Sequence, residues 1–149
     1  MRYMGEAEIA GVARRLRELT ADGFVPRDLA IFCRSETRLK ERAEAALRRC
    51  GWVGHYLSDD APPTDAQVSL GSMHRAKGLE FKVVIVMGRD ADLLPRASVL
   101  EEMVDEADQA AFVEQERQLL YVACTRAKER LFVTYSGKPS RLLLNQINK

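Results

Sequence analysis

The segment Glu116–Ala127 places a Thr-Arg pair at the end of a stretch with helical spacing, shortly before an apolar run at Leu131–Val133. The arginine is Arg126, whose guanidinium stays charged and presents a planar fork of hydrogen-bond donors. At the edge of a buried strand, such a group is well placed to reach the phosphates of a nucleotide that is bound elsewhere. An arginine at a helix C-terminus also fits a simpler role, in which it interacts with the helix dipole.

A second polar segment, Ser72–Phe81, precedes the most hydrophobic run of the chain, Val83–Met87. Within it, Gly71–Gly78 has the outline of the phosphate-binding loop G-x-x-x-x-G-K-[ST]. The match fails at Ala76, where the second glycine would free backbone N–H groups, and at Gly78, where a hydroxyl would ligate magnesium. No acidic pair follows a strand as a magnesium site would require. The Walker A and B motifs are therefore absent, and we expect no ATP hydrolysis by this chain alone.

Hydrophobic spacing predicts the elements that position these two segments. We expect helices over 6–21, 39–50, 108–124 and 141–147, and strands over 29–33, 52–57, 68–70, 83–87 and 131–135. Strands that alternate with helices indicate an α/β fold with a mostly parallel sheet covered on both faces, and the apolar run 83–87 suits a central strand. Ligands of such sheets bind beyond the carboxyl ends of the strands. We therefore expect the site in the loops after Cys33, Leu70 and Met87, together with the helix end at Arg126.

The composition is that of a globular protein of one domain, with 149 residues of which 46% are hydrophobic and 30% charged. No apolar run approaches the roughly 20 residues that a membrane span needs, and the N-terminus lacks the apolar stretch of a secretory signal. Cys33, Cys50 and Cys124 lack metal-ligand spacing, so we expect reduced, buried thiols and a cytoplasmic protein. The net charge of +1 does not indicate nucleic-acid binding through bulk charge.

The two polar segments, in this order, resemble motifs V and VI of the superfamily 1 helicases of the UvrD/Rep/PcrA type. Residues 69–81 are similar to the pattern T-x-H-x-A-K-G-L-E-F, with Ser72 in place of the threonine. Residues 114–127 are similar to E-E-R-R-L-x-Y-V-A-x-T-R-A, with Gln115 and Gln118 as departures. These departures put some polar contacts of the helix in doubt, while the Thr-Arg pair matches.

For the nucleotide, the resemblance implies three contacts on this chain. The arginine at position 126 matches the family's arginine finger, which stabilises the charge of the phosphoryl-transfer transition state. Glu80 matches a glutamate that hydrogen-bonds the ribose, and Gly78 belongs to the same nucleotide-side turn. The resemblance also implies ATP and Mg²⁺ as cofactors, bound mainly by the first RecA-like domain of the same helicase.

For the single DNA strand, the resemblance implies contacts from Ser72 and His74 in motif V. Residues 29–35 are similar, more weakly, to the family's strand-Arg-Ser/Thr element, which implies a backbone contact from Arg34. A hydroxyl, a ring N–H and a guanidinium can all donate to phosphate oxygens. A structural role for His74 and a surface salt bridge for Arg34 remain open alternatives.

Taken together, the resemblance implies that residues 1–149 are one C-terminal RecA-like motor domain without the family's large accessory insertion, and a fragment of a longer helicase. The implied function is that of an ATP-dependent 3′–5′ DNA helicase or translocase, with single-stranded DNA and the N-terminal RecA-like domain as partners and no membrane. A non-hydrolysing module that binds single-stranded nucleic acid or docks onto a partner is the first alternative. A structural scaffold with degenerate motifs is the second, and the choice between DNA and RNA stays open.

Overall fold

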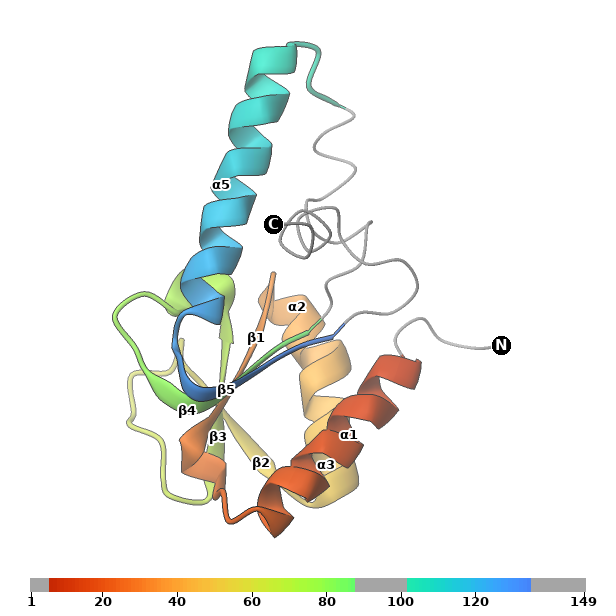
Figure 1. Cartoon of the computed structure of the whole chain (residues 1–149), viewed down its shortest axis with the longest axis vertical. Helices are drawn as coiled ribbons and strands as arrows, with labels where there is room; N and C mark the ends of the chain where they lie inside the picture. The colour runs from red at the N-terminus through yellow and green to blue at the C-terminus, as the bar shows by residue number, and fades with distance from the viewer. Residues whose placement is uncertain (1–5, 88–101, 135–149) are drawn as a thin grey trace.

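A computed structural model describes residues 6–87 and 102–134 (Figure 1). The predicted helix at 141–147 and the end of the last predicted strand at Tyr135 lie outside these residues. So does most of the stretch 91–103, whose spacing predicts an irregular or partly helical segment. The helical elements are α1 (Glu6–Ala21), η1 (Pro26–Asp28), α2 (Glu36–Arg38), η2 (Leu39–Ala43), α3 (Glu44–Cys50), η3 (Met73–Arg75) and α5 (Glu106–Cys124). The strands are β1 (Leu29–Cys33), β2 (Val53–Tyr56), β3 (Gln67–Ser72), β4 (Phe81–Val86) and β5 (Ala127–Val133).

The five strands form one sheet in the order β2-β3-β1-β4-β5, and each neighbouring pair runs parallel. This confirms the predicted α/β class. The middle position belongs to β1, whose five residues are all buried. The predicted central run forms β4, which has a neighbour on each side but lies next to the edge strand β5. Both strands are apolar for the same reason, since each is covered on its two faces and paired on its two edges.

Each face of the sheet has its own core. On one face, α1, η2 and α3 pack over residues such as Ile31 and Ile85. On the other, η3 and α5 pack over residues such as Phe32 and Val84. Figure 1 shows α5 standing over the carboxyl ends of the strands and projecting beyond them. The alternation of inward residues along β1 and β4 thus divides the hydrophobic residues between two layers.

The segment after β1 forms three short elements instead of the single helix that we predicted over 39–50. Ser35 caps α2 by accepting a hydrogen bond from the backbone N–H of Arg38. The chain then widens into the π-helical turn η2 and continues as α3. Gly51 ends α3 in a left-handed conformation with φ 71°, as is common for a helix C-terminus. The stripe of apolar residues predicted the packing face but did not reveal the extra residue of the π-turn.

Two boundaries near the C-terminal motif differ from prediction. The strand β5 begins at Ala127, four residues before the predicted start, because its exposed first half is charged and gave no apolar signal. In α5 the fully buried stripe is Val113, Glu116, Leu120 and Ala123. Helical spacing of the apolar residues favours Phe112 and Leu119 on that stripe, but both are only half-buried. The inward face is therefore rotated slightly and is centred on Glu116.

Candidate functional site

The helix end at Arg126 and the turn before β4 meet at the amino ends of two neighbouring strands. Phe81, the first residue of β4, donates its backbone N–H to the carbonyl oxygen of Arg126 at 2.9 Å. Phe81 and Ala127 are also paired in the parallel register of β4 and β5. Glu80 lies one residue before β4, and Arg126 lies one residue before β5. The two residues are therefore side by side at the amino ends of these strands.

The guanidinium of Arg126 is held by three neutral oxygen atoms. Its Nε donates to the carbonyl oxygen of Val122 at 3.1 Å, and its Nη2 donates to the hydroxyl of Thr125 at 3.1 Å. Its Nη1 reaches the carbonyl oxygen of Leu79, in the turn before β4, at 3.4 Å. No carboxylate of the described residues forms an ion pair with this side chain. The guanidinium thus interacts with the C-terminal end of α5, as the simpler role predicts. No carboxylate neutralises its charge, so it can still bind an anionic group.

The turn that carries Gly78 and Glu80 is short and exposed. Gly78 has φ 83°, a left-handed conformation that other residues rarely adopt, and the N–H of Leu79 donates to the carbonyl oxygen of Ala76 at 3.2 Å. The Glu80 side chain is 64% exposed and lies 3.3 Å from the Nζ of Lys128. An ion pair this exposed is weak. The carboxylate is therefore free to accept further hydrogen bonds from solvent or from a ligand.

A second group of predicted residues gathers at the other end of the strands, where β1 and β3 finish. Ser72 ends β3 and pairs in register with Cys33, so that Arg34 begins next to it after β1. The turn η3 follows directly, with Met73 buried and His74 exposed. The residues assigned to single-stranded DNA are thus brought together at the carboxyl ends of β1 and β3.

The side chain of Arg34 forms a bidentate ion pair with Glu116 of α5. Its Nε and Nη2 each donate to one carboxylate oxygen at 2.8 Å, and the two side chains are 20% and 3% exposed. The salt bridge that the sequence left open as an alternative is therefore present, and it is largely buried. It neutralises the charge of Arg34 and uses two of its three nitrogen atoms.

The nucleotide-side and DNA-side residues lie at opposite ends of the strands. We had expected one site at the carboxyl ends, including the helix end at Arg126. The structure places Arg126 and Glu80 at the amino ends of β5 and β4 instead, because α5 runs back over the sheet before β5 begins. The segment 73–80 joins the two groups, since it runs from the end of β3 to the start of β4.

Sequence reasoning missed two functional candidates on α5. Glu116 appeared only as the first residue of the segment 116–127, although a carboxylate at an inward position indicates a buried cation as its partner. Arg117 was not singled out. Its Nη1 pairs with Glu114 at 3.1 Å, whereas its buried Nε has no hydrogen-bond partner. Its position directly after Glu116 in the C-terminal motif was the only signal in the sequence.

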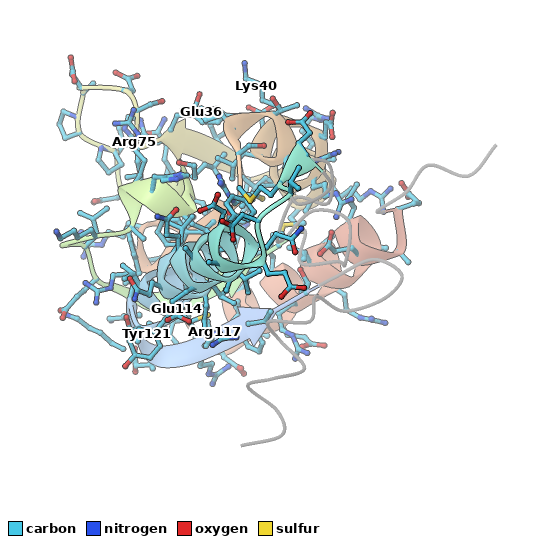
Figure 2. The ribbon with its side chains drawn as sticks, turned by 90° about the horizontal axis from the view of Figure 1, so that it is seen from above. Glu36, Lys40, Arg75, Glu114, Arg117 and Tyr121 are labelled. Carbon is cyan, nitrogen blue, oxygen red and sulfur yellow. The ribbon has the colours of Figure 1, made fainter. Side chains whose placement is uncertain are left out.

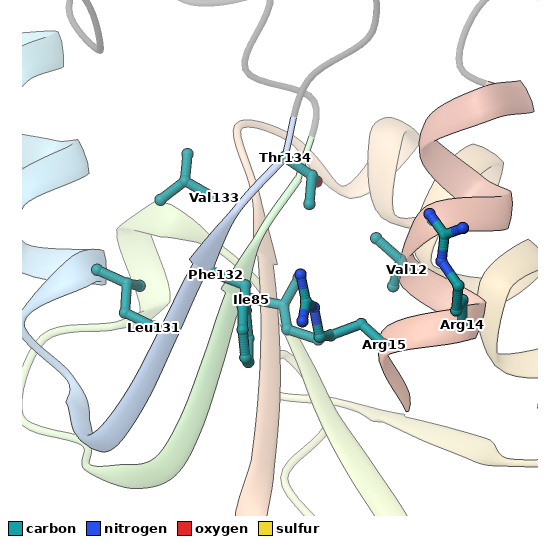
Figure 3. A pocket seen from close by; sticks show the side chains of 9 residues that line it. Val12, Arg14, Arg15, Ile85, Leu131, Phe132, Val133 and Thr134 are labelled. Carbon is teal, nitrogen blue, oxygen red and sulfur yellow. The ribbon is translucent and has the colours of Figure 1, made fainter. Parts of the chain in front are cut away.

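Other candidates are less specific. Trp52 and Tyr56 have rings that could stack on bases, but core packing is the more common role of such residues, and both pack against the core. A pocket of about 300 Å³ lies between α1 and β5, where the guanidinium of Arg15 sits 4.5 Å from the ring centre of Phe132 (Figure 3). It contains none of the predicted site residues.

Three broader features can be stated for residues 6–87 and 102–134. No cluster of three or more potential metal ligands occurs in this part of the chain. None of its helices is long and apolar enough to cross a membrane. The three cysteines, which all lie in this part of the chain, form no disulfide with one another, and only Cys33 is fully buried.

Known proteins are similar to this chain over the region that contains both motifs. The family described as the UvrD-like helicase C-terminal domain matches residues 55–138, which include both motifs but not Arg34. ATP-dependent DNA helicase PcrA of Staphylococcus aureus is 37% identical over 87 residues, covering 58% of this chain and 11% of that helicase. PcrA of Staphylococcus epidermidis is 40% identical over 95 residues, covering 56% of this chain and 12% of that helicase.

The chain thus spans about a tenth of the length of these relatives. Among solved structures, it is similar to the C-terminal domain of a possible DNA helicase from Lactobacillus plantarum WCFS1, with a TM-score of 0.63 and 25% identity. That match covers 93% of this chain and 72% of the other. Because the family match extends over more than half of the residues, includes both motifs and agrees with the fold, the chain belongs to the UvrD-like helicase C-terminal domain family.

Proposed function

We propose that this chain is the C-terminal motor domain of an ATP-dependent 3′–5′ DNA helicase or translocase. The observation that carries the proposal is the hydrogen-bonded junction between Arg126 and the turn before β4, because it sets a guanidinium beside Glu80. A charged donor and an exposed acceptor at one edge suit a ligand with both phosphates and ribose hydroxyls. ATP has this chemistry, and the N-terminal RecA-like domain of the same helicase would hold most of it together with Mg²⁺.

In this proposal, Arg126 acts as an arginine finger. Its present acceptors are neutral, so exchanging one of them for a phosphate oxygen gains a charge-assisted hydrogen bond. Such a donor stabilises the charge that spreads over the transferring phosphoryl group, and a finger of this kind contributes about 10³–10⁵-fold in rate. Glu80 accepts from the ribose, and Gly78 lets the turn adopt the conformation that presents it.

In the same proposal, the residues at the carboxyl ends of β1 and β3 contact the single-stranded DNA. Ser72 and His74 donate to phosphate oxygens, and Arg34 contributes the nitrogen atom that Glu116 does not hold. The segment 73–80 connects this edge to the nucleotide edge. A movement that brings Glu80 onto the ribose therefore shifts His74 relative to the strand, which couples the two ligands.

The test is the rate of ATP hydrolysis by the intact helicase with Arg126→Ala. We expect turnover to fall by at least about 10³-fold while single-strand binding is preserved, because the finger acts on the transition state. Arg126→Lys keeps the charge but not the fork of donors, and we expect it to restore little activity. Arg117→Ala is the matched control, since it removes another arginine of the C-terminal motif, one whose buried Nε has no hydrogen-bond partner. If Arg117→Ala abolished turnover and Arg126→Ala did not, the finger role would belong to Arg117.

The isolated chain provides the complementary measurement. We expect no ATP hydrolysis with or without single-stranded DNA, and strand-stimulated hydrolysis once the N-terminal motor domain is added. Binding of single strands without any hydrolysis after this addition would favour the alternative of a non-hydrolysing binding module. Hydrolysis by the chain alone would place the whole nucleotide site within it and contradict the proposal.

A further inference from the structure

Most of the arginines in the described residues are already engaged with a protein acceptor. Carboxylates pair with Arg15, Arg27, Arg38, Arg42, Arg49 and Arg130, among others. Arg75 differs because it is exposed and forms no ion pair or hydrogen bond with any residue that the structure describes. The same holds for Lys77, two residues further along. The turn that follows β3 therefore carries two exposed positive charges without a described partner, Arg75 and Lys77.

The backbone of this turn is anchored although its charged side chains are exposed. Met73 and Ala76 are buried in the core that the turn shares with α5. The N–H of Ala76 donates to the carbonyl oxygen of Met73 at 3.2 Å, which closes one 3₁₀ turn. The inward residues fix the backbone, so Arg75 is presented from a defined place rather than from a loose loop. Pre-organisation of this kind lowers the entropy lost when a ligand binds.

Arg75 also compares directly with Arg34, because both follow strands that are neighbours in the sheet. Cys33, at the end of β1, pairs in register with Ser72, at the end of β3. Arg34 is neutralised by a bidentate carboxylate, whereas no such partner holds Arg75. Of the two guanidinium groups at this edge, Arg75 therefore has the greater capacity to release counterions from a nucleic-acid backbone.

The surroundings of Arg75 indicate which ligand it would meet. Seen from above, Arg75 and Lys40 lie on one side of α5 together with Glu36, and Glu114, Arg117 and Tyr121 lie on the other (Figure 2). Lys40 is likewise exposed without a described partner. The nucleotide-side residue Glu80 lies at the other end of the strands, directly before β4. Ser72 and His74 are the predicted contacts to single-stranded DNA, and these exposed cations lie close to them in the sequence and the sheet. A nucleic-acid backbone, which carries one phosphate charge per nucleotide, fits such an arrangement.

We propose that Arg75 supplies a phosphate contact to single-stranded DNA, next to Ser72 and His74, and that it contributes more to binding than Arg34. This inference rests on the proposed function, because it assumes that the single strand crosses this edge. The family pattern leaves the position between the histidine and the alanine unspecified. The contact is thus a feature of this sequence and not one that the resemblance supplies.

The experiment measures binding of the full 149-residue chain to fluorescein-labelled dT15 and dA15 by anisotropy over a series of salt concentrations. The variants are Arg75→Gln, Arg75→Lys and Arg34→Gln. Arg14→Gln is the matched control, since Arg14 is also exposed without a described ion pair but lies on α1, beside the pocket of Figure 3. Circular dichroism verifies that each variant is folded.

We expect Arg75→Gln to reduce the slope of log K against log salt by about 0.7, which is the loss of one phosphate contact on a single strand, and to weaken binding roughly tenfold at low salt. The loss should be equal for dT15 and dA15, because phosphate contacts carry no sequence information. Arg75→Lys should keep the slope. Arg34→Gln should change it less, and Arg14→Gln should leave it unchanged.

An effect of Arg75→Gln no larger than that of Arg14→Gln, in a chain that still binds DNA, would overturn the inference and leave the proposed function standing. A loss confined to one of the two oligonucleotides would also overturn it, because the contact would then be to a base. If the unaltered chain did not bind either strand, the DNA side of the proposed function itself would fail.

Discussion

At the scale of single residues, a buried ion pair joins three parts of the chain. The Nη1 of Arg42 donates to Glu8 at 2.7 Å, and the two side chains are 3% and 0% exposed. The other carboxylate oxygen of Glu8 accepts from the hydroxyl of Thr134 at 2.8 Å. The pair thus links α1, the π-turn η2 and the residue after β5. Removing one partner of such a pair leaves a buried charge uncompensated.

We expect Arg42→Ala to lower the free energy of unfolding by about 3–5 kcal/mol in urea denaturation. The control is Arg38→Ala, in the same segment, whose pair with Glu41 is 38% and 52% exposed. An exposed pair contributes at most about 1 kcal/mol, so the control should be nearly as stable as the parent chain. Equal losses in the two variants would show that the buried pair has no special role.

The sequence predicted the residues of the site better than their partners. It identified the residues of both motifs from their types and order. It left Arg34 between a phosphate contact and a salt bridge, because the partner Glu116 lies 82 positions away and only the fold brings the two together. It also did not reveal that Arg126 binds the carbonyl oxygen of Leu79, since a backbone acceptor has no signature in the sequence.

At the scale of elements, α3 and the strands β2 and β3 approach too closely to admit another carbon atom at Gly54. A Cβ built there would lie 2.3 Å from the Cδ1 of Leu70 and 3.2 Å from the Cδ1 of Leu47. Leu70 is fully buried in the core and cannot move far. The absence of a side chain at Gly54 therefore sets the distance between these elements.

We expect Gly54→Ala to destabilise the fold by about 1–3 kcal/mol, as overpacking does in a closely packed core. Gly11→Ala is the opposite case, because no atom lies within 4 Å of its Cβ position and the residue sits inside α1. Alanine at a helix interior is favoured over glycine by about 0.5–1 kcal/mol, so this variant should be more stable. Urea or thermal unfolding of the two proteins should give shifts of opposite sign. Shifts of the same sign would contradict this account.

Elements with one apolar face were predicted well from the sequence, and elements with a charged or irregular part were not. The bounds of α1 and β1 agree with the prediction to the residue, because an apolar stripe and a bounded apolar run mark them. The first half of β5 was missed, since Lys128, Glu129 and Arg130 are exposed at an edge of the sheet. Backbone pairing with β4 makes this half a strand, and pairing leaves no trace in side-chain polarity.

At the scale of the whole molecule, burial raises the pKa of the Cys33 thiol well above its ordinary range, and the nearby carboxylate of Glu8 adds to the rise. The folded state therefore keeps this proton at pH values where the unfolded chain loses it. The unfolded thiol titrates near pH 8.5. Stability is thus fully present below about pH 8.5 and declines above it, because the folded state then binds more protons than the unfolded state.

We expect Cys33 to make the free energy of unfolding fall by up to about 1.4 kcal/mol per pH unit above pH 8.5. The pKa of Tyr56 is also raised, first by burial and then by its hydrogen bond to Glu44, so it adds to the fall at still higher pH. Cys33→Ala should reduce the slope between pH 8.5 and 10, whatever its stability at pH 7. Urea unfolding at three pH values would measure this. An unchanged slope in the variant would exclude Cys33 as a source.

The placement of the two groups of site residues at opposite ends of the strands could not be predicted from the motifs alone. The resemblance assigns the residues of motif V to two ligands, and the first of them end β3 whereas the last precede β4. Which end of the sheet each residue reaches depends on strand order, and that order is set by packing between elements distant in sequence. The topology therefore separates His74 from Glu80, although only five residues lie between them.

The parallel sheet also has a consequence for how the chain reaches its native state. Among the five described strands, no two neighbours are joined by a hairpin. The middle strand β1 pairs with β3 and β4, which lie more than 30 residues later in the chain. Parallel pairing of this kind requires distant segments to meet before any contact stabilises them, so it forms slowly. During that search, apolar segments such as Phe81–Val86 remain exposed to other chains. Recovery of this protein after dilution from denaturant should therefore depend more on chain concentration than on the stability of its folded form.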